Sequence, residues 1–163
     1  MDPAVESDGH GRLFFRGSRY LLIRPETLVA LQRAVERAVG TDAASVLAAG
    51  GHAGGARATS TLPGDPEARV RALLAMGAEI GWGEFALERL GPRELVVTVR
   101  HSPFAETWGG RSRTPVCHLT RGVLESLAAV VFAEPRPVVE TECVAMGAPA
   151  CRFTALATRE PAR

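Results

Sequence analysis

Three cysteines and a glutamate in the last third of the 163-residue chain have a spacing that could form a metal site. The pattern C-x22-E-x2-C-x7-C joins Cys117, Glu140, Cys143 and Cys151. Three thiolates and one carboxylate are soft or anionic donors that suit tetrahedral zinc. The alternative is that the cysteines are simply buried without a metal, because free cysteine is among the most buried residue types.

The elements that must position these ligands are a helix and two strands. Pro115 predicts the start of the helix, which places Cys117 in its first turn, where the helix dipole lowers the pKa of a thiol. Strands are predicted over 138–144 and 151–155, joined by a tight turn around Gly147. That turn would bring the last two cysteines together, as the knuckles of zinc fingers do.

The rest of the chain predicts short strands and amphipathic helices. Together they indicate an α+β domain, with an antiparallel sheet assembled from both ends of the chain and packed helices in the middle. A single domain is expected over 12–156, with flexible termini at 1–11 and 157–163. The remaining predicted elements are a hairpin within 13–23, helices over 26–39, 42–57 and 65–81, strands over 85–90 and 94–100, and a loop over 101–115.

The helix predicted over 42–57 is rich in alanine and glycine. Each glycine costs about 1 kcal/mol of helix propensity, so we expect this helix to be buried where another backbone comes close. Its stretch GGHAG, over 50–54, follows no strand and lacks the G-x-G-x-x-G order of a dinucleotide site. Close helix packing is therefore the favoured interpretation.

The composition is that of an ordinary globular protein, with 46% hydrophobic and 23% charged residues. A formal net charge of +1 argues against direct binding of nucleic acid, which usually needs a clear basic excess. All 19 residues in the Lys and Arg class are arginine. Schiff-base and P-loop mechanisms are excluded, because both need a lysine.

The sequence predicts neither a membrane span nor a signal peptide. Its longest apolar runs, such as 127–133, are far shorter than the roughly 20 residues that a span requires. The first residues include Asp2, Glu6 and Asp8, where a signal peptide carries positive charge. We therefore expect a cytoplasmic protein, in which cysteines serve metal binding or redox chemistry more readily than disulfides.

A small apolar pocket is the second site that the sequence predicts. Ligand pockets in small domains are mostly apolar, with a few polar groups that orient the ligand. Plain core packing is the alternative for most of these side chains, and the two tryptophans could also form lids or dimer contacts. The candidate ligand-binding residues are His52, Met76, Ile80, Trp82, Phe85, His101, Phe104 and Trp108.

Several C-terminal motifs carry a family resemblance. They are CHLTRGVL over 117–124, VETECVAMG over 139–147 and PACRF over 149–153, preceded by SPFA over 102–105. With the helical layout upstream, the chain resembles the 4-vinyl reductase domain family over roughly 12–156. The resemblance implies a dimer and an α+β fold, shared with ligand-binding domains of nitric-oxide signalling and with vesicle-tethering subunits of Golgi transport.

The resemblance also implies a ligand set for the metal. Related sensor domains of phenol- and toluene-responsive transcription activators hold zinc through Cys, Glu, Cys and Cys at this spacing, which maps onto Cys117, Glu140, Cys143 and Cys151. They bind an aromatic effector in a neighbouring pocket. Glu142 competes with Glu140, since a regular strand puts Glu140 and Cys143 on opposite faces, and a bulge or strand end is needed. Four protein ligands leave no open position, so the zinc would be structural.

The expected function is that of a stand-alone sensor or carrier of a hydrophobic or aromatic molecule, because no catalytic set of residues is recognisable. One alternative is an enzyme or accessory protein of tetrapyrrole modification, of the bacteriochlorophyll type, which a coloured purified protein would support. The other is a protein-interaction module like the tethering subunits, which a pocket filled by side chains would support.

Overall fold

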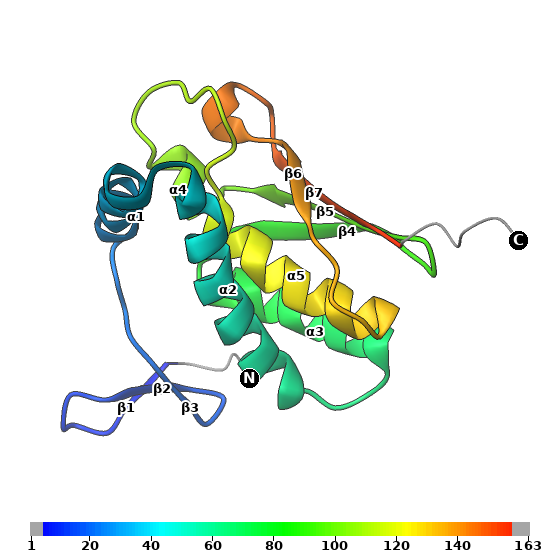
Figure 1. The fold of residues 1–163 in the computed structure, drawn as a ribbon. Coiled ribbons are helices and arrows are strands. Elements are labelled where there is room, and N and C mark those ends of the chain that lie inside the picture. Colours follow the sequence, from blue (N-terminus) through cyan, green and yellow to red (C-terminus); the bar gives the residue numbers. More distant parts are fainter. Residues whose placement is uncertain (1–4, 158–163) are drawn as a thin grey trace, which may run out of the picture.

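The computed structural model describes residues 5–157 and has two antiparallel sheets and a layer of helices (Figure 1). The α+β class predicted from the sequence is confirmed. In chain order the elements are β1 (Glu6–Ser7), β2 (Leu13–Phe15), β3 (Ser18–Tyr20), α1 (Pro25–Val39), η1 (Gly40–Asp42), α2 (Ala43–Ser60), α3 (Pro66–Glu79), β4 (Glu84–Leu90), β5 (Glu94–Arg100), α4 (Pro103–Glu106), α5 (His118–Phe132), β6 (Val139–Glu142), η2 (Val144–Met146) and β7 (Cys151–Leu156).

The main sheet has the strand order β4-β5-β7-β6, and every neighbouring pair is antiparallel. Its central strand β5 is rich in β-branched residues and is buried at Leu95, Val96, Val97 and Val99. Apolar side chains of α3 and α5 join this sheet in one hydrophobic core. The last strand in the chain, β7, therefore lies inside the sheet and not at its edge.

Helices α2 and α5 cross at a contact that only glycine permits. A methyl group in place of the hydrogen at Gly51 would overlap the carbonyl oxygen of Leu119, and one at Gly122 would overlap that of Ala48. The expectation that the glycine-rich helix is buried against another backbone is confirmed, because these two helices touch backbone to backbone. This contact fixes α5, and with it the cysteine that precedes α5.

Helix starts follow the local sequence closely. The side chain of Asp65 accepts a hydrogen bond of 2.8 Å from the N–H of Ala68, and Pro66 opens α3 as expected. The loop predicted over 101–115 contains a short helix, α4, that the sequence analysis missed. Its cap is Ser102, whose Oγ accepts a hydrogen bond of 3.5 Å from the N–H of Ala105.

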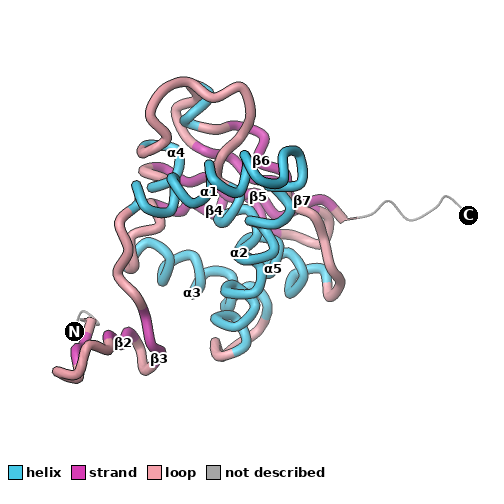
Figure 2. Tube along the Cα trace, turned by 60° about the vertical axis from the view of Figure 1, so that its left-hand side comes forward, coloured by secondary structure: helices cyan, strands magenta, loops and turns pink. Residues whose placement is uncertain are grey.

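The N-terminal strands β1, β2 and β3 form a small sheet that projects from the rest of the molecule in both views (Figures 1 and 2). Phe15 is buried, and Arg16 forms an ion pair of 2.8 Å with Glu79 at the end of α3. Residues 6–7, expected in a flexible tail, pair with β2 instead. The second strand of the hairpin ends at Tyr20, and the apolar residues 21–23 that follow it are exposed.

The two predicted tails lie largely beyond the part of the chain that the structure describes. Residues 1–4 and 158–163 are outside it, and Ala157 donates a backbone hydrogen bond of 2.9 Å to the carbonyl of Arg93. Within 5–157, no helix combines the length and apolar character that a membrane crossing needs.

Candidate metal centre and apolar pocket

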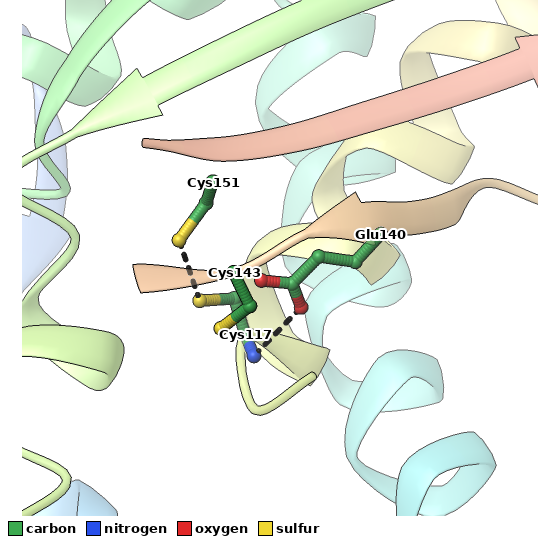
Figure 3. A group of neighbouring side chains, drawn as sticks. All are labelled: Cys117, Glu140, Cys143 and Cys151. Atoms are coloured by element: carbon green, nitrogen blue, oxygen red, sulfur yellow. Dashed lines mark hydrogen bonds between the residues drawn. The ribbon is translucent and has the colours of Figure 1, made fainter. Parts of the chain in front are cut away.

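The four predicted metal ligands converge at one end of the main sheet (Figure 3). One ligand atom from each of Cys117, Glu140, Cys143 and Cys151 lies within 4.8 Å of all the others. All four residues are buried, and the three sulfurs belong to free cysteines. Residues from three separate stretches of the chain thus form one enclosed cluster.

Each ligand is placed by an element boundary. Cys117 is the N-cap of α5, one residue before the first turn in which the sequence analysis placed it. Cys151 begins β7. Cys143 follows the end of β6 and caps the turn η2, and its carbonyl accepts hydrogen bonds from the N–H groups of Met146 (2.9 Å) and Ala148 (3.2 Å). Gly147 closes this turn with φ of 99°, a left-handed conformation that glycine adopts without strain.

An irregularity in β6 allows Glu140 and Cys143 to face the same point. The pairing of β6 with β7 shifts register between Glu140 and Glu142, and Cys143 lies beyond the strand. The bulge or strand end that Glu140 requires as a ligand is therefore present. Glu142 is exposed and outside the cluster, so the geometry selects Glu140 between the two carboxylates.

The carboxylate of Glu140 has one oxygen satisfied and one without a partner. The backbone N–H of Cys117 donates to Oε2 over 3.0 Å, whereas Oε1 is buried and accepts no hydrogen bond. A buried carboxylate oxygen without a donor costs free energy unless a cation or a proton compensates it. The orphaned oxygen therefore fits the fourth ligand of a metal.

The spacing of the sulfurs also fits a metal. The Sγ atoms of Cys117 and Cys151 are 3.6 Å apart, much longer than the disulfide bond length of about 2.05 Å. Two sulfurs that each lie about 2.3 Å from a tetrahedral zinc ion would be about 3.8 Å apart. The cluster is thus close to the size that a zinc tetrahedron needs.

The cluster cannot hold all its negative charges without a cation. Burial, reinforced by the charge of Cys143, raises the pKa of the Glu140 carboxyl to about 8. A hydrogen bond with Cys143 raises the pKa of the Cys117 thiol far above its ordinary value, and the same contact lowers the pKa of Cys143 to about 2. One thiolate is therefore stabilised by protonated neighbours, and a divalent cation would replace those protons.

Two further hydrogen bonds reach the sulfurs from outside the cluster. Ser102, which is buried, has its Oγ 3.2 Å from the Sγ of Cys117. The N–H of Val144 donates to the Sγ of Cys151 over 3.4 Å. Sequence reasoning did not identify Ser102 as part of this site, because only the fold brings residue 102 beside residue 117.

An apolar pocket of about 350 Å³ lies between the N-terminal sheet, the end of α3 and α4. Three predicted ligand-binding residues, Ile80, Trp82 and Phe104, line it. The rings of Trp82 and Phe104 meet edge to face, with centroids 5.6 Å apart. The rest of its wall comes mainly from the hairpin and the start of α1, including Phe15, Tyr20 and Leu28, which sequence analysis had placed in no site.

The other five predicted ligand-binding residues do not line this pocket, so that part of the set is corrected. Met76 is buried against Tyr20, and Phe85 packs on Gly77. His101 is exposed and its Nδ1 lies 3.0 Å from Glu106. The remaining two are His52, which lines a separate hollow between α2 and α5, and Trp108, whose ring lies under the guanidinium of Arg33.

Residues 95–156 match the family model of the 4-vinyl reductase domain, a span that runs from β5 to β7 and includes all four clustered ligands. The resemblance to this family is confirmed over that span. No curated protein matches the sequence.

Solved structures share the fold at low sequence identity. The phenol-responsive sensory domain of the transcription activator PoxR with phenol has a TM-score of 0.81 at 16% identity, over 93% of this chain and 83% of that one. A vinyl-4-reductase family protein from Methanocaldococcus jannaschii has 0.59 at 14% identity, over 83% and 82%. A trafficking protein particle complex subunit 3 from Naegleria fowleri, covalently bound to palmitic acid, has 0.59 at 10% identity, over 85% and 98%.

Proposed function

We propose that this chain, whose residues 95–156 match the 4-vinyl reductase domain, is a zinc-stabilised domain that binds a small hydrophobic or aromatic molecule as a sensor or carrier. The observation that carries the proposal is the apolar pocket of about 350 Å³ walled by Trp82 and Phe104. The fold that the chain shares with a phenol-responsive sensory domain supports an aromatic molecule as the ligand.

Zinc is the metal that the donor set favours. Three thiolates and a carboxylate are typical of zinc sites, whereas magnesium and calcium prefer oxygen ligands alone. Cys117, Glu140, Cys143 and Cys151 would occupy all four tetrahedral positions, so the ion contributes stability and leaves no position for substrate. When bound, it ties the start of α5 to both strands of the C-terminal hairpin. Three free cysteines also suit a reducing compartment, and we infer a cytoplasmic location.

The pocket has the chemistry of a site for a small aromatic ligand. Its volume is at the lower end of the range for small-molecule sites, about 300–1,000 Å³. Apolar side chains from the hairpin, α1, α3 and α4 surround it, and Tyr20 and Glu79 are the polar-ended side chains among its lining residues. An aromatic ring could pack against Trp82, and a hydroxyl on that ring could bond to one of these polar groups.

The outer face of α1 supports a homodimer. Ala30, Leu31, Ala34 and Ala38 are all exposed along this face, and the side chain of Leu31 is 57% accessible. The first turn carries an acidic residue and the last turn a basic one, Glu26 and Arg37. Two copies of α1 packed antiparallel about a twofold axis would bury the alanines and pair these opposite charges.

Native mass spectrometry of the purified protein, compared with the same sample denatured, tests the proposal. We expect one zinc per chain, a dimer, and an organic adduct that is lost on denaturation. If no adduct is present, titration with a panel of phenols and other small aromatics, followed by Trp82 fluorescence in a Trp108→Phe variant, gives the second reading. Zinc without any adduct or response would favour an interaction module, and a bound tetrapyrrole would favour the tetrapyrrole alternative.

A further inference from the structure

Ser102 lies between the apolar pocket and the metal centre. It is 1% exposed, and its Oγ is 3.2 Å from the Sγ of Cys117. The same oxygen accepts the N–H of Ala105, and the carbonyl of Ser102 accepts the N–H of Glu106 over 3.0 Å, so this residue starts α4. The next two residues of α4, Pro103 and Phe104, line the pocket.

Metal binding fixes the direction of the Ser102 hydroxyl. A metal-bound thiolate has no proton and can only accept a hydrogen bond, so the Ser102 hydroxyl must donate to the sulfur of Cys117. The lone pairs of the same oxygen then remain free to accept the N–H of Ala105. Without a metal, Cys117 is a thiol that can itself donate to Ser102. One hydroxyl thus has a single arrangement when the metal is bound and two when it is not.

We propose that Ser102 is a positioning residue of the metal centre, which holds the Cys117 thiolate by a hydrogen bond and connects it to the pocket wall at Phe104. The inference rests on the metal binding proposed above. Groups that bond to metal ligands orient them and tune the metal, and their loss typically weakens metal binding about 10- to 100-fold. Because Phe104 belongs to the same short helix, a change at the pocket would alter this hydrogen bond, and by linkage the metal would alter the pocket.

Cobalt(II) is the probe, because its sulfur-to-metal charge-transfer band reports the thiolates directly. In the full chain loaded with cobalt, Ser102→Ala should move this band to lower energy, since a thiolate without its hydrogen bond donates electrons more readily. The zinc dissociation constant, measured by chelator competition, should rise about tenfold. Ser102→Thr keeps the hydroxyl and should keep both wild-type values. Asp65→Ala removes the cap of α3 and controls for the loss of a helix cap.

The pocket side is tested with Phe104→Leu, and Phe85→Leu serves as a control because Phe85 packs on Gly77 and not on α4. We expect the cobalt band to move in the Phe104 variant and to stay in place in the Phe85 variant. An unchanged band in Ser102→Ala overturns the role of Ser102, as does a moved band in Ser102→Thr if the alanine variant does not fold. Equal effects of the two phenylalanine variants overturn the connection to the pocket. A wild-type protein that binds neither cobalt nor zinc instead overturns the proposed metal site.

Discussion

The backbone N–H of Cys117 donates a hydrogen bond of 3.0 Å to Oε2 of Glu140, a residue 23 positions further along the chain. This bond leaves the other carboxylate oxygen, Oε1, buried without a donor. Figure 3 shows the Glu140 carboxylate beside the sulfurs of the cluster. A single backbone group thus orients the carboxylate for the role that we propose for it.

Glu140→Gln should weaken zinc binding at least tenfold. The amide keeps an oxygen that can accept the N–H of Cys117, but it removes the negative charge that offsets the dication. Glu142→Gln is the matched control, because the exposed Glu142 lies outside the cluster and should leave zinc affinity unchanged. Competition with a chromophoric chelator measures both. Equal affinities for Glu140→Gln and wild type would show that this carboxylate is not a ligand.

Cys143→Ser should abolish stoichiometric zinc and lower the melting temperature. Serine is a poor zinc ligand, and in a structural site the free energy of metal binding is also free energy of folding. Elemental analysis of the dialysed protein and a thermal melt give the two readings. Addition of a strong chelator to the wild type should lower its melting temperature by a similar amount and have little effect on the variant. Full zinc content in Cys143→Ser would exclude the proposed ligand set.

Zinc affinity should rise with pH across the range from 6 to about 8. In the metal-free cluster, burial raises the pKa of Glu140 to about 8, and a hydrogen bond with Cys143 raises that of Cys117 further. Both groups hold protons below those values and must release them to bind zinc, so affinity falls as pH falls. Two released protons correspond to about a 100-fold change per pH unit.

The same pH series in Glu140→Gln isolates the carboxyl. This variant has one proton fewer to release, so its affinity should change about tenfold less per pH unit than that of the wild type. A wild-type affinity that does not depend on pH in this range would contradict the proton displacement.

Gly51→Ala should destabilise the protein by about 1–3 kcal/mol, because the new methyl group overlaps the carbonyl of Leu119 and pushes α2 away from α5. Gly54→Ala lies in the same helix, where an added Cβ meets nothing within 4 Å. It should stabilise by about 0.5–1 kcal/mol through helix propensity alone. Urea unfolding of both variants measures the difference. Equal shifts would mean that the α2–α5 contact is looser than the structure shows.

Leu31→Glu should convert the proposed dimer to a monomer. The substitution places a charge in the middle of the exposed alanine face of α1, where a second copy of the helix would bury it. Leu156→Glu is the control, because Leu156 is similarly exposed, at 61%, but lies at the end of β7. Sedimentation velocity of the wild type and both variants decides. A wild type that sediments as a monomer would remove the proposed interface.

The metal cluster could be predicted well from the sequence because its ligands lie at element boundaries that the local sequence determines. Pro115 and the β-branched run before Glu142 indicated the helix and strand, and Gly147 indicated the turn between the last two cysteines. The cap of α5 was missed by one residue, because Cys117 precedes the first turn. The choice of Glu140 over Glu142 needed the register shift in β6, which is a property of the paired strands and not of one strand.

The pocket could be predicted only in part, because it forms between elements that are distant in the sequence. Ile80, Trp82 and Phe104 were expected, but the walls that Phe15 and Tyr20 supply depend on how the N-terminal sheet docks on α3. Isolated aromatic and histidine residues such as His101 have no local pattern that separates a pocket from the surface. The role of Ser102 was invisible for the same reason, since it depends on α4 reaching the start of α5.

The position of β7 between β5 and β6 has a consequence for how the protein is made. During synthesis the chain emerges in order, so Cys117, Glu140 and Cys143 are available before Cys151 and its strand. Until then, β5 and β6 have no neighbour between them, and the metal cluster has three of its four ligands. A nascent chain stalled just before Cys151 would therefore present a partial, exchangeable metal site, and the ion would be locked in place only when the last strand inserts into the sheet.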